Sequence, residues 1–162
     1  MTAALAAGQY TLAPQRCIVR FTARGFGLRV PGEMSVRSGE VRVDGASAVV
    51  TAVLDAASFR TRSARRDRDV RSARFLDTDQ HPDILLTGRW DGRGTALRAT
   101  LTVKGVAAPV DIEVVDVQRS PHGARAAARA RLDRRAFPVG PVRGPVGRWV
   151  DVELDVALLP AP

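Results

Sequence analysis

The 162-residue sequence has only one cysteine and no long apolar run, so it lacks the features that cross-link small proteins or anchor proteins in membranes. Cys17 is the only cysteine, which excludes an intramolecular disulfide and any metal site built from several cysteines. No apolar run approaches the roughly 18–20 residues that a membrane-spanning helix needs. The first seven residues carry no basic region and no apolar run long enough for a secretory signal. We therefore expect a cytoplasmic protein in which residues 1–7 form a disordered tail.

Motifs for catalysis and cofactor binding are equally scarce. The sequence has no G-x-S-x-G nucleophile motif, no phosphate-binding P-loop and no G-x-G-x-x-G. His81 and His122 stand in turns without an accompanying cysteine or acidic motif, so we interpret them as surface residues rather than metal ligands. Cys17 leads a strand and is expected to be a buried, inert thiol. These absences predict a non-enzymatic protein with no catalytic residue, no metal and no cofactor.

Positive charge is plentiful but unevenly spread. Lys104 is the only lysine among 25 basic residues, and the formal net charge is +8. Residues 60–74 hold seven arginines and two aspartates, and residues 119–148 hold eight arginines and one aspartate. Such stretches bind anionic lipid headgroups, phosphates or nucleic acid, and they also form plain solvated faces. Composition leaves both interpretations open.

Apolar and polar residues alternate along most of the chain, which indicates half-buried β-strands. The alternation is clearest over 150–158, and it recurs over 19–24, 34–43, 97–103 and 110–114, with a slip near Gly39 that we interpret as a bulge. Two further segments differ: 48–54 is apolar on both faces and predicts a covered strand, and Ile84 and Leu86 begin a strand after Pro82.

The segment His122–Leu132 gives conflicting signals. Its alanines and arginines favour helix, but its alternation favours a strand, which we prefer because the preceding strands need a partner. Hairpin turns are predicted where a glycine can take a positive φ, at the pairs 44–45, 91–92 and 104–105. The best helix candidate is Ser63–Arg74, capped by Ser63, with Val70 and Ala73 facing the body of the protein.

These elements predict an all-β fold, with about eight antiparallel strands and one short crossover helix in a single domain over residues 8–160. Eight strands are the number at which a closed barrel just holds side chains or one small ligand. Closure also removes the edge strands that promote aggregation. A transmembrane barrel would need girdles of aromatic residues, which make up only 5% of this sequence. We therefore expect a water-soluble barrel with an apolar interior.

Short segments in a fixed order carry a family resemblance from about Tyr10 to Leu158. They are the runs 58–61 (Ser-Phe-Arg-Thr), 66–67 (Arg-Asp), 70–77, 81–84, 101–110 and 132–137. In this order and spacing they resemble the YceI-like family of lipocalin-like, polyisoprenoid-binding proteins. Four positions depart from the family pattern and affect contacts at the barrel mouth more than the fold: Gly25, Asp69, Leu76 and Pro138.

The resemblance implies an antiparallel eight-stranded lipocalin-like barrel that binds, carries or sequesters a long-chain isoprenoid or quinone-like lipid, often as a homodimer. Inward-facing alanines would leave the volume that such a chain needs, whereas the alternative is a filled, dry core. The residues expected to line the apolar tunnel are Val19, Phe21, Ala23, Phe75, Leu76, Ile84, Leu86, Leu97, Ala99, Leu101, Val103, Ala126, Ala128, Ala130 and Phe137.

A second function remains open, in which the arginine-rich stretches bind nucleic acid or an anionic surface. Nucleic acid is the weaker partner because only Phe59 and Phe75 flank the first stretch, and stacking platforms need more aromatic residues. Peripheral contact with an anionic membrane surface needs no such platform. The pairs 66–67 (Arg-Asp) and 133–134 (Asp-Arg) are interpreted as structural ion pairs that pin the crossover helix to the barrel.

Overall fold

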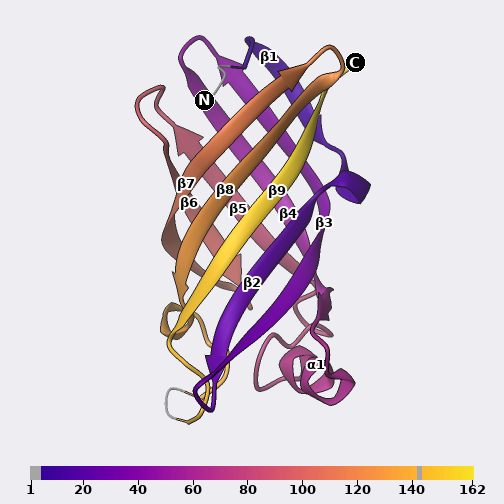
Figure 1. Cartoon of the computed structure of the whole chain (residues 1–162), viewed down its shortest axis with the longest axis vertical. Helices are drawn as coiled ribbons and strands as arrows, with labels where there is room; N and C mark the ends of the chain where they lie inside the picture. The colour runs from indigo at the N-terminus through magenta and orange to yellow at the C-terminus, as the bar shows by residue number, and fades with distance from the viewer. Residues whose placement is uncertain (1–4, 142–143) are drawn as a thin grey trace.

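The computed structural model describes residues 5–141 and 144–162, in which the chain forms a closed antiparallel β-barrel (Figure 1). Each strand from β2 to β9 pairs with the next along the chain, and β9 returns to pair with β2. These strands are β2 (Ile18–Gly25), β3 (Leu28–Asp44), β4 (Ser47–Arg60), β5 (Asp83–Trp90), β6 (Ala96–Val103), β7 (Val106–Ser120), β8 (Gly123–Asp133) and β9 (Trp149–Pro160). The predicted eight-stranded barrel with one short helix is confirmed.

A ninth strand, β1 (Gly8–Leu12), occupies the same place in the ring as β2. It pairs with the far ends of β3 and β9, and a single 3₁₀ turn, η1 (Pro14–Arg16), separates it from β2. Across this break the Ala13 N–H donates to the Ala157 carbonyl at 3.0 Å. The strand β1 is not predicted by the sequence pattern, because five residues give too short an alternation. Residues 1–4 of the expected tail lie outside the described residues, and Leu5 packs against the core.

The hydrophobic core is the barrel interior. Along β9, Val152 and Leu158 are buried while Asp151 and Glu153 face water, as the alternation predicts. The segment with conflicting signals forms the strand β8. It pairs with β7 on one side and, over residues 124–133, with β9 on the other. Two full ladders outweigh the helix propensity of its alanines and arginines, so the strand prediction is confirmed.

The slip predicted near Gly39 is present in β3, where the register against β4 shifts between Val36 and Ser38, and a further shift lies between Glu33 and Ser35. Gly39 itself pairs regularly with Ala52. The strand β4 differs from expectation because it is not covered on both faces: Val49 is 40% exposed. A barrel made of one sheet has no second layer to bury the outer apolar side chains.

The crossover helix α1 (Ala64–Arg71) is shorter than predicted. Ser63 caps it as expected, with its hydroxyl oxygen accepting a hydrogen bond from the Arg66 N–H at 3.2 Å. Val70 packs against the core, but Ala73 is exposed, so that part of the prediction is wrong. The helix ends three residues earlier because the Ser72 N–H donates to the Asp69 carbonyl in a tighter turn.

The two ends of the barrel carry different connections (Figure 1). The α1 end holds the connections between β2 and β3, β4 and β5, β6 and β7, and β8 and β9, which are residues 26–27, 61–82, 104–105 and 134–148. The termini end holds three short hairpin turns, residues 45–46, 91–95 and 121–122, together with the N- and C-terminal segments.

Candidate functional site

The barrel interior holds most of the residues expected to line a tunnel. Twelve of the fifteen lie on one face of β2, β5, β6 or β8, and the other three come from connections at the α1 end: Phe75, Leu76 and Phe137. Thirteen belong to the core or pack against it. The two exceptions are Ala23, near the end of β2, and the half-buried Phe75. Whether any of them touches a ligand stays a prediction.

The expected lining omitted four strands. The strands β3, β4, β7 and β9 contribute as much to the interior, through buried residues that include Met34, Leu54, Ile112 and Val152. Their signal was present in the sequence, because the same alternation that places Leu97 and Leu101 inward also places Val152 and Leu158 inward. The interior is therefore lined by the whole ring.

Small side chains gather on the inner face of β8. Ala124, Ala126, Ala128 and Ala130 follow one another at every second position, and their neighbours across the β8–β9 ladder are Leu158, Val156, Leu154 and Val152. No large side chain in the described residues is fully enclosed: the larger core residues keep 3–9% of their surface accessible, and only Ala56 and Ala157 fall to 1%. The larger side chains of the interior thus keep some accessible surface, and the alanines of β8 add little bulk to it.

Aromatic side chains close the α1 end of the interior. Phe21 and Phe59 stack with ring centroids 5.0 Å apart and planes 13° from parallel. Gly32 makes room for this stack, because a Cβ there would lie 2.6 Å from the Phe21 ring. Leu76 and Phe137, from the two long connections, are buried at the same end. These contacts form an apolar floor beneath the barrel.

Arg134 holds the connection between β8 and β9 in place. It is 7% exposed and has no carboxylate partner within the described residues. Its guanidinium instead donates four hydrogen bonds of 2.7–3.0 Å to the backbone carbonyls of Val139, Pro141, Val146 and Gly147. Burial lowers the pKa of Arg134, and the charge of neighbouring Arg135 lowers it further. The guanidinium thus supplies hydrogen bonds to backbone carbonyls that have no partner strand in this irregular segment.

The ion pairs expected at the two Arg-Asp motifs are not formed. Asp133 pairs with Arg148, at 2.9 and 3.0 Å, and this hydrogen-bonded cation lowers the pKa of the Asp133 carboxyl. The buried Asp67 accepts hydrogen bonds from the backbone N–H and the hydroxyl of Thr61, at 2.8 and 2.7 Å, rather than from Arg66. Charged groups do pin this region, but mostly to backbone and hydroxyl groups.

Lys104 ties three connections together. Its ammonium lies in the turn between β6 and β7 and donates to the carbonyls of Ala73 and Pro138, at 2.7 and 3.0 Å. The Gly140 N–H adds a further link by donating to the Arg74 carbonyl at 2.9 Å. The α1 end is therefore a joined surface rather than a set of independent loops.

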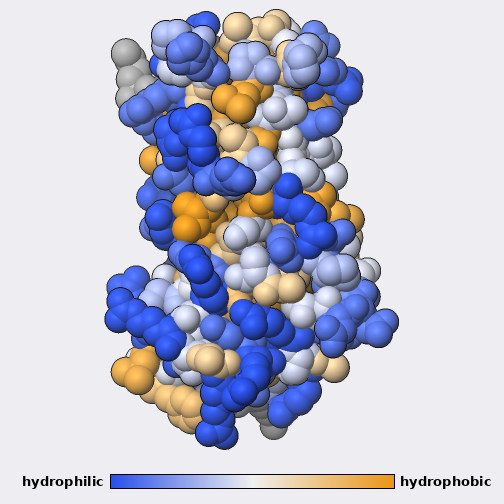
Figure 2. Space-filling view, turned by 90° about the vertical axis from the view of Figure 1, so that its right-hand side faces the viewer, coloured by the Kyte–Doolittle hydropathy of each residue, from blue (hydrophilic) through white to orange (hydrophobic). Residues whose placement is uncertain are grey.

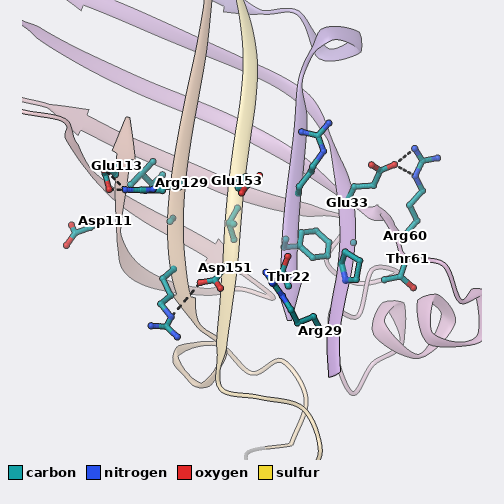
Figure 3. A pocket seen from close by; sticks show the side chains of 18 of the residues that line it. Thr22, Arg29, Glu33, Arg60, Thr61, Asp111, Glu113, Arg129, Asp151 and Glu153 are labelled. Atoms are coloured by element: carbon teal, nitrogen blue, oxygen red, sulfur yellow. Dashed lines mark hydrogen bonds and ion pairs between the residues drawn. The ribbon is translucent and has the colours of Figure 1, made fainter. Parts of the chain in front are cut away.

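A hollow of about 1020 Å³ lies on the outside of the barrel (Figure 3). Its walls are outward side chains that lie opposite one another on neighbouring strands and alternate in charge: Glu113, Arg129, Glu153, Arg20, Glu33 and Arg60. Arg129 pairs with Glu113 at 3.1 Å, and Arg60 pairs with Glu33. Phe21 and Ala130 border this groove only because they stand between two outward residues.

That outer groove is distinct from the expected tunnel. Six arginines and five acidic residues line it, so it offers an ionic ligand a net charge of only +1. A second, smaller hollow of about 410 Å³ lies across β3, β4 and β5, also on the outside. Neither hollow supports a tunnel-lining role for the fifteen residues, and the case for a ligand rests on the interior itself.

Other candidate groups are less prominent. Cys17 is half-buried, its Sγ accepts a hydrogen bond from the Ala157 N–H at 3.3 Å, and burial raises the pKa of the thiol. His122 is exposed and His81 is half-buried. No group of three or more histidine, cysteine or acidic side chains suited to a metal ion occurs among the described residues. Within the same residues, no helix is long and apolar enough to cross a lipid bilayer.

A closed antiparallel barrel, apolar inside and floored at one end by a crossover helix, is the architecture of lipocalin-like β-barrel proteins. The chain belongs to the YceI-like family, whose domain model matches residues 10–158. It is similar to Protein YceI of Escherichia coli O17:K52:H18, with 29% identity over 115 residues, which are 66% of this chain and 60% of that protein. The match to UPF0312 protein ECA1782 of Pectobacterium atrosepticum is 30% over 117 residues, 67% of this chain and again 60% of the relative.

Solved structures share the fold at low sequence identity. BcnA of Burkholderia cenocepacia aligns with a TM-score of 0.77 and 18% identity, over 90% of this chain and 98% of that one. A polyisoprenoid binding domain from Saccharophagus degradans aligns with a TM-score of 0.74 and 16% identity, over 94% and 98% of the two chains. The resemblance inferred from the sequence motifs is thus confirmed at the level of family and fold.

Proposed function

We propose that this protein binds, carries or sequesters a long-chain isoprenoid or quinone-like lipid inside its barrel, without catalysis. The observation that carries the proposal is the apolar interior, in which the larger side chains all keep some accessible surface, with its strip of alanines on β8. Support also comes from the family and from a structural neighbour described as polyisoprenoid binding.

The chemistry of the interior favours an uncharged chain. Among the described residues, the buried polar or charged side chains are only Asp67, Thr78 and Arg134, and all three lie in connections at the α1 end. Each buried CH₂ of a ligand is worth about 0.8 kcal/mol before the cost of ordering the chain. A long branched hydrocarbon therefore gains affinity from such a site, whereas a fatty acid would need a partner for its carboxylate.

The decisive measurement is native mass spectrometry of the purified protein together with organic extraction of its contents. We expect a bound neutral lipid. The variant Ala128→Phe places a ring on the inner face of β8, where the lipid would run, and should lose the ligand while staying folded.

A matched control is available on the same strand. Ala127 pairs with Asp155 and lies on the outer face, so Ala127→Phe adds the same ring outside and should keep the ligand. If the interior were a filled core, Ala128→Phe would overpack it at a cost of about 1–3 kcal/mol. An early-melting Ala128→Phe variant, from a parent with no extractable lipid, would overturn the proposal.

Nucleic-acid binding is not favoured by the geometry. The strand arginines Arg125, Arg129 and Arg131 each form an ion pair with an acidic residue of β7 or β9 and are thus partly neutralised. The homodimer and the cytoplasmic location stay predictions. Size-exclusion chromatography with light scattering tests the first, and fractionation of the source cells tests the second.

A further inference from the structure

The net charge of the chain is concentrated at one end of the barrel. The described residues of the connections at the α1 end carry ten basic and four acidic side chains, a net charge of +6 against a formal total of +8 for the whole chain. The nine strands carry twelve of each sign, and the hairpin turns at the termini end carry one of each, Arg93 and Asp91. The protein is therefore strongly dipolar, with a neutral barrel wall and a basic α1 end.

Three arginines of this end face solvent and have no ion-pair partner among the described residues. Arg62, Arg65 and Arg68 are exposed on and beside α1, and within the described residues none of them forms an ion pair. Five of the twelve strand arginines form ion pairs within the described residues, among them Arg125 with Asp155 and Arg129 with Glu113. Unpaired arginines are free to meet an anionic surface at little desolvation cost.

The same end presents apolar side chains to water. Four of the eight exposed large hydrophobic residues of the described chain belong to this end. Two of them lie at the turn between β2 and β3: Phe26, in the turn, is 85% exposed, and Leu28, directly after it, is 69% exposed. Phe26 has φ of 52° and Gly27 has φ of 75°, a two-residue turn that favours Asn-Gly over Phe-Gly. Neither burial nor turn geometry explains a phenylalanine there.

The apolar turn and the basic connections form one surface. The Phe26 N–H donates to the Pro145 carbonyl at 3.1 Å, and the Gly147 N–H donates to the Arg24 carbonyl at 2.7 Å. Residues 134–148 are in turn bonded to the α1 connection through Lys104 and Gly140. In Figure 2, hydrophilic side chains crowd the lower end of the molecule and an apolar cluster protrudes at its lower left.

We propose that the α1 end is a docking surface for an anionic lipid bilayer, with Phe26 and Leu28 inserted at the boundary between headgroups and acyl chains. The surrounding arginines would bind the lipid phosphates, as basic segments near membranes do. A bilayer fits better than nucleic acid because the protruding tip offers aliphatic as well as aromatic surface and no row of stacking rings. The docking rests on charge and exposure; that it serves to load the barrel from the membrane rests on the proposed function.

Vesicle flotation tests the docking directly. The full chain should bind vesicles of phosphatidylcholine mixed with phosphatidylglycerol, bind pure phosphatidylcholine weakly, and lose affinity as salt rises. Phe26→Asn should weaken binding by about tenfold or more, because the inserted ring is lost. The same substitution suits the turn better, so its melting temperature should not fall, which separates lost docking from unfolding.

A control variant addresses the side of the barrel. Val49 is 40% exposed on β4, away from the α1 end, so Val49→Asn removes an exposed apolar side chain without touching the proposed surface and should leave vesicle binding unchanged. Equal loss in Phe26→Asn and Val49→Asn, or no binding to anionic vesicles by the parent, would overturn the proposal.

The two tryptophans report on orientation. Trp149 is 44% exposed at the α1 end, with the guanidinium carbons of Arg148 and Arg131 at 4.8 and 5.3 Å from its ring centroid, whereas Trp90 lies at the termini end. In single-tryptophan variants, Trp90→Phe and Trp149→Phe, brominated lipids should quench Trp149 and spare Trp90. Quenching of Trp90 instead, or binding of a single-stranded oligonucleotide in place of vesicles, would refute membrane docking at this end.

The outcomes also separate the two proposals. Docking by a protein whose extracts contain no lipid would leave the docking surface standing and remove the carrier function. Extractable lipid without vesicle binding would do the reverse.

Discussion

Replacing Arg134 by methionine tests whether one buried cation organises the α1 end. The guanidinium is 7% exposed and donates to four carbonyls of residues 139–147. A hydrogen bond to a charged group contributes about 1.5–3 kcal/mol, but burying the cation costs several kcal/mol in lost hydration. Removing the arginine also leaves the carbonyls without their donor. We expect Arg134→Met to lower the free energy of unfolding by about 3–5 kcal/mol, as for other broken buried charge networks.

Urea unfolding gives that value, and hydrogen exchange shows where the loss falls. The amide hydrogens of residues 139–147 should exchange much faster. The exchange rates of the β7–β8 ladder should change only as far as the free energy of global unfolding changes. Arg134→Lys keeps the charge but not the planar fork of donors and should recover only part of the loss. As a control, Arg129→Met removes the exposed pair with Glu113 and should cost less than about 1 kcal/mol. An Arg134→Met effect as small as that control would refute the reasoning.

Three further outcomes follow from contacts elsewhere. Gly39→Ala places a Cβ into the Leu12 side chain, so thermal denaturation should show a loss of about 1–3 kcal/mol, and an unchanged melting temperature would contradict the packing. Burial raises the pKa of the Cys17 thiol, so iodoacetamide should alkylate it slowly at neutral pH, faster in alkali and fastest in urea; rapid reaction of the folded protein at neutral pH would contradict this. The Arg148 hydrogen bond lowers the pKa of Asp133, so the pair stabilises the fold above the unfolded aspartate pKa of about 3.9 and loses that stabilisation as pH falls through the lower folded value. Asp133→Asn should therefore destabilise the protein at neutral pH more than at strongly acidic pH in denaturant titrations, and an equal effect at both would count against the pair.

The strands could be predicted from the sequence because each barrel strand has one face toward the apolar interior and one face toward water. The segment 150–158 shows this without ambiguity, and even 124–132, where helix propensity competes, follows the alternation. Turn chemistry supplied the connections: Gly45, Gly92 and Gly105 all adopt the positive φ that the hairpins need. Local pattern and global fold agree at these positions, and that agreement made the barrel predictable.

The register between β3 and β4 and the break between β1 and β2 could not be predicted in the same way. The shift within β3 depends on its partner β4, where the Ser58 hydroxyl accepts a hydrogen bond from the Ser35 N–H at 2.8 Å. No pattern within residues 34–43 contains that contact. The break between β1 and β2 likewise depends on how Ala157 of β9 meets Ala13. Features that need two distant segments at once exceed what alternation along one segment can specify.

The floor of the barrel was the least predictable part of the candidate site. Its residues were found, since Leu76 and Phe137 were named with the tunnel lining, but the interactions that place them were not. Arg134 was expected to bind its neighbour Asp133, which would have been the nearest opposite charge. Carbonyl groups of an irregular segment, up to 13 residues away in sequence, bind it instead. Backbone acceptors carry no sequence signal.

The basic stretch at residues 119–148 shows how topology changes the meaning of a charge run. Its strand portion lies opposite acidic residues of β7 and β9, and pairs such as Arg125 with Asp155 cancel there. Its second portion lies in a connection, which has no opposite strand, so its charge remains. In an antiparallel barrel every second connection falls at the same end, and here all four connections at the α1 end fall beside one another while the turns at the other end are neutral. Two runs that are separate in sequence thus become one basic surface, with the Phe26 turn as its apolar tip. The positive charge of the chain is therefore concentrated at one end of the barrel.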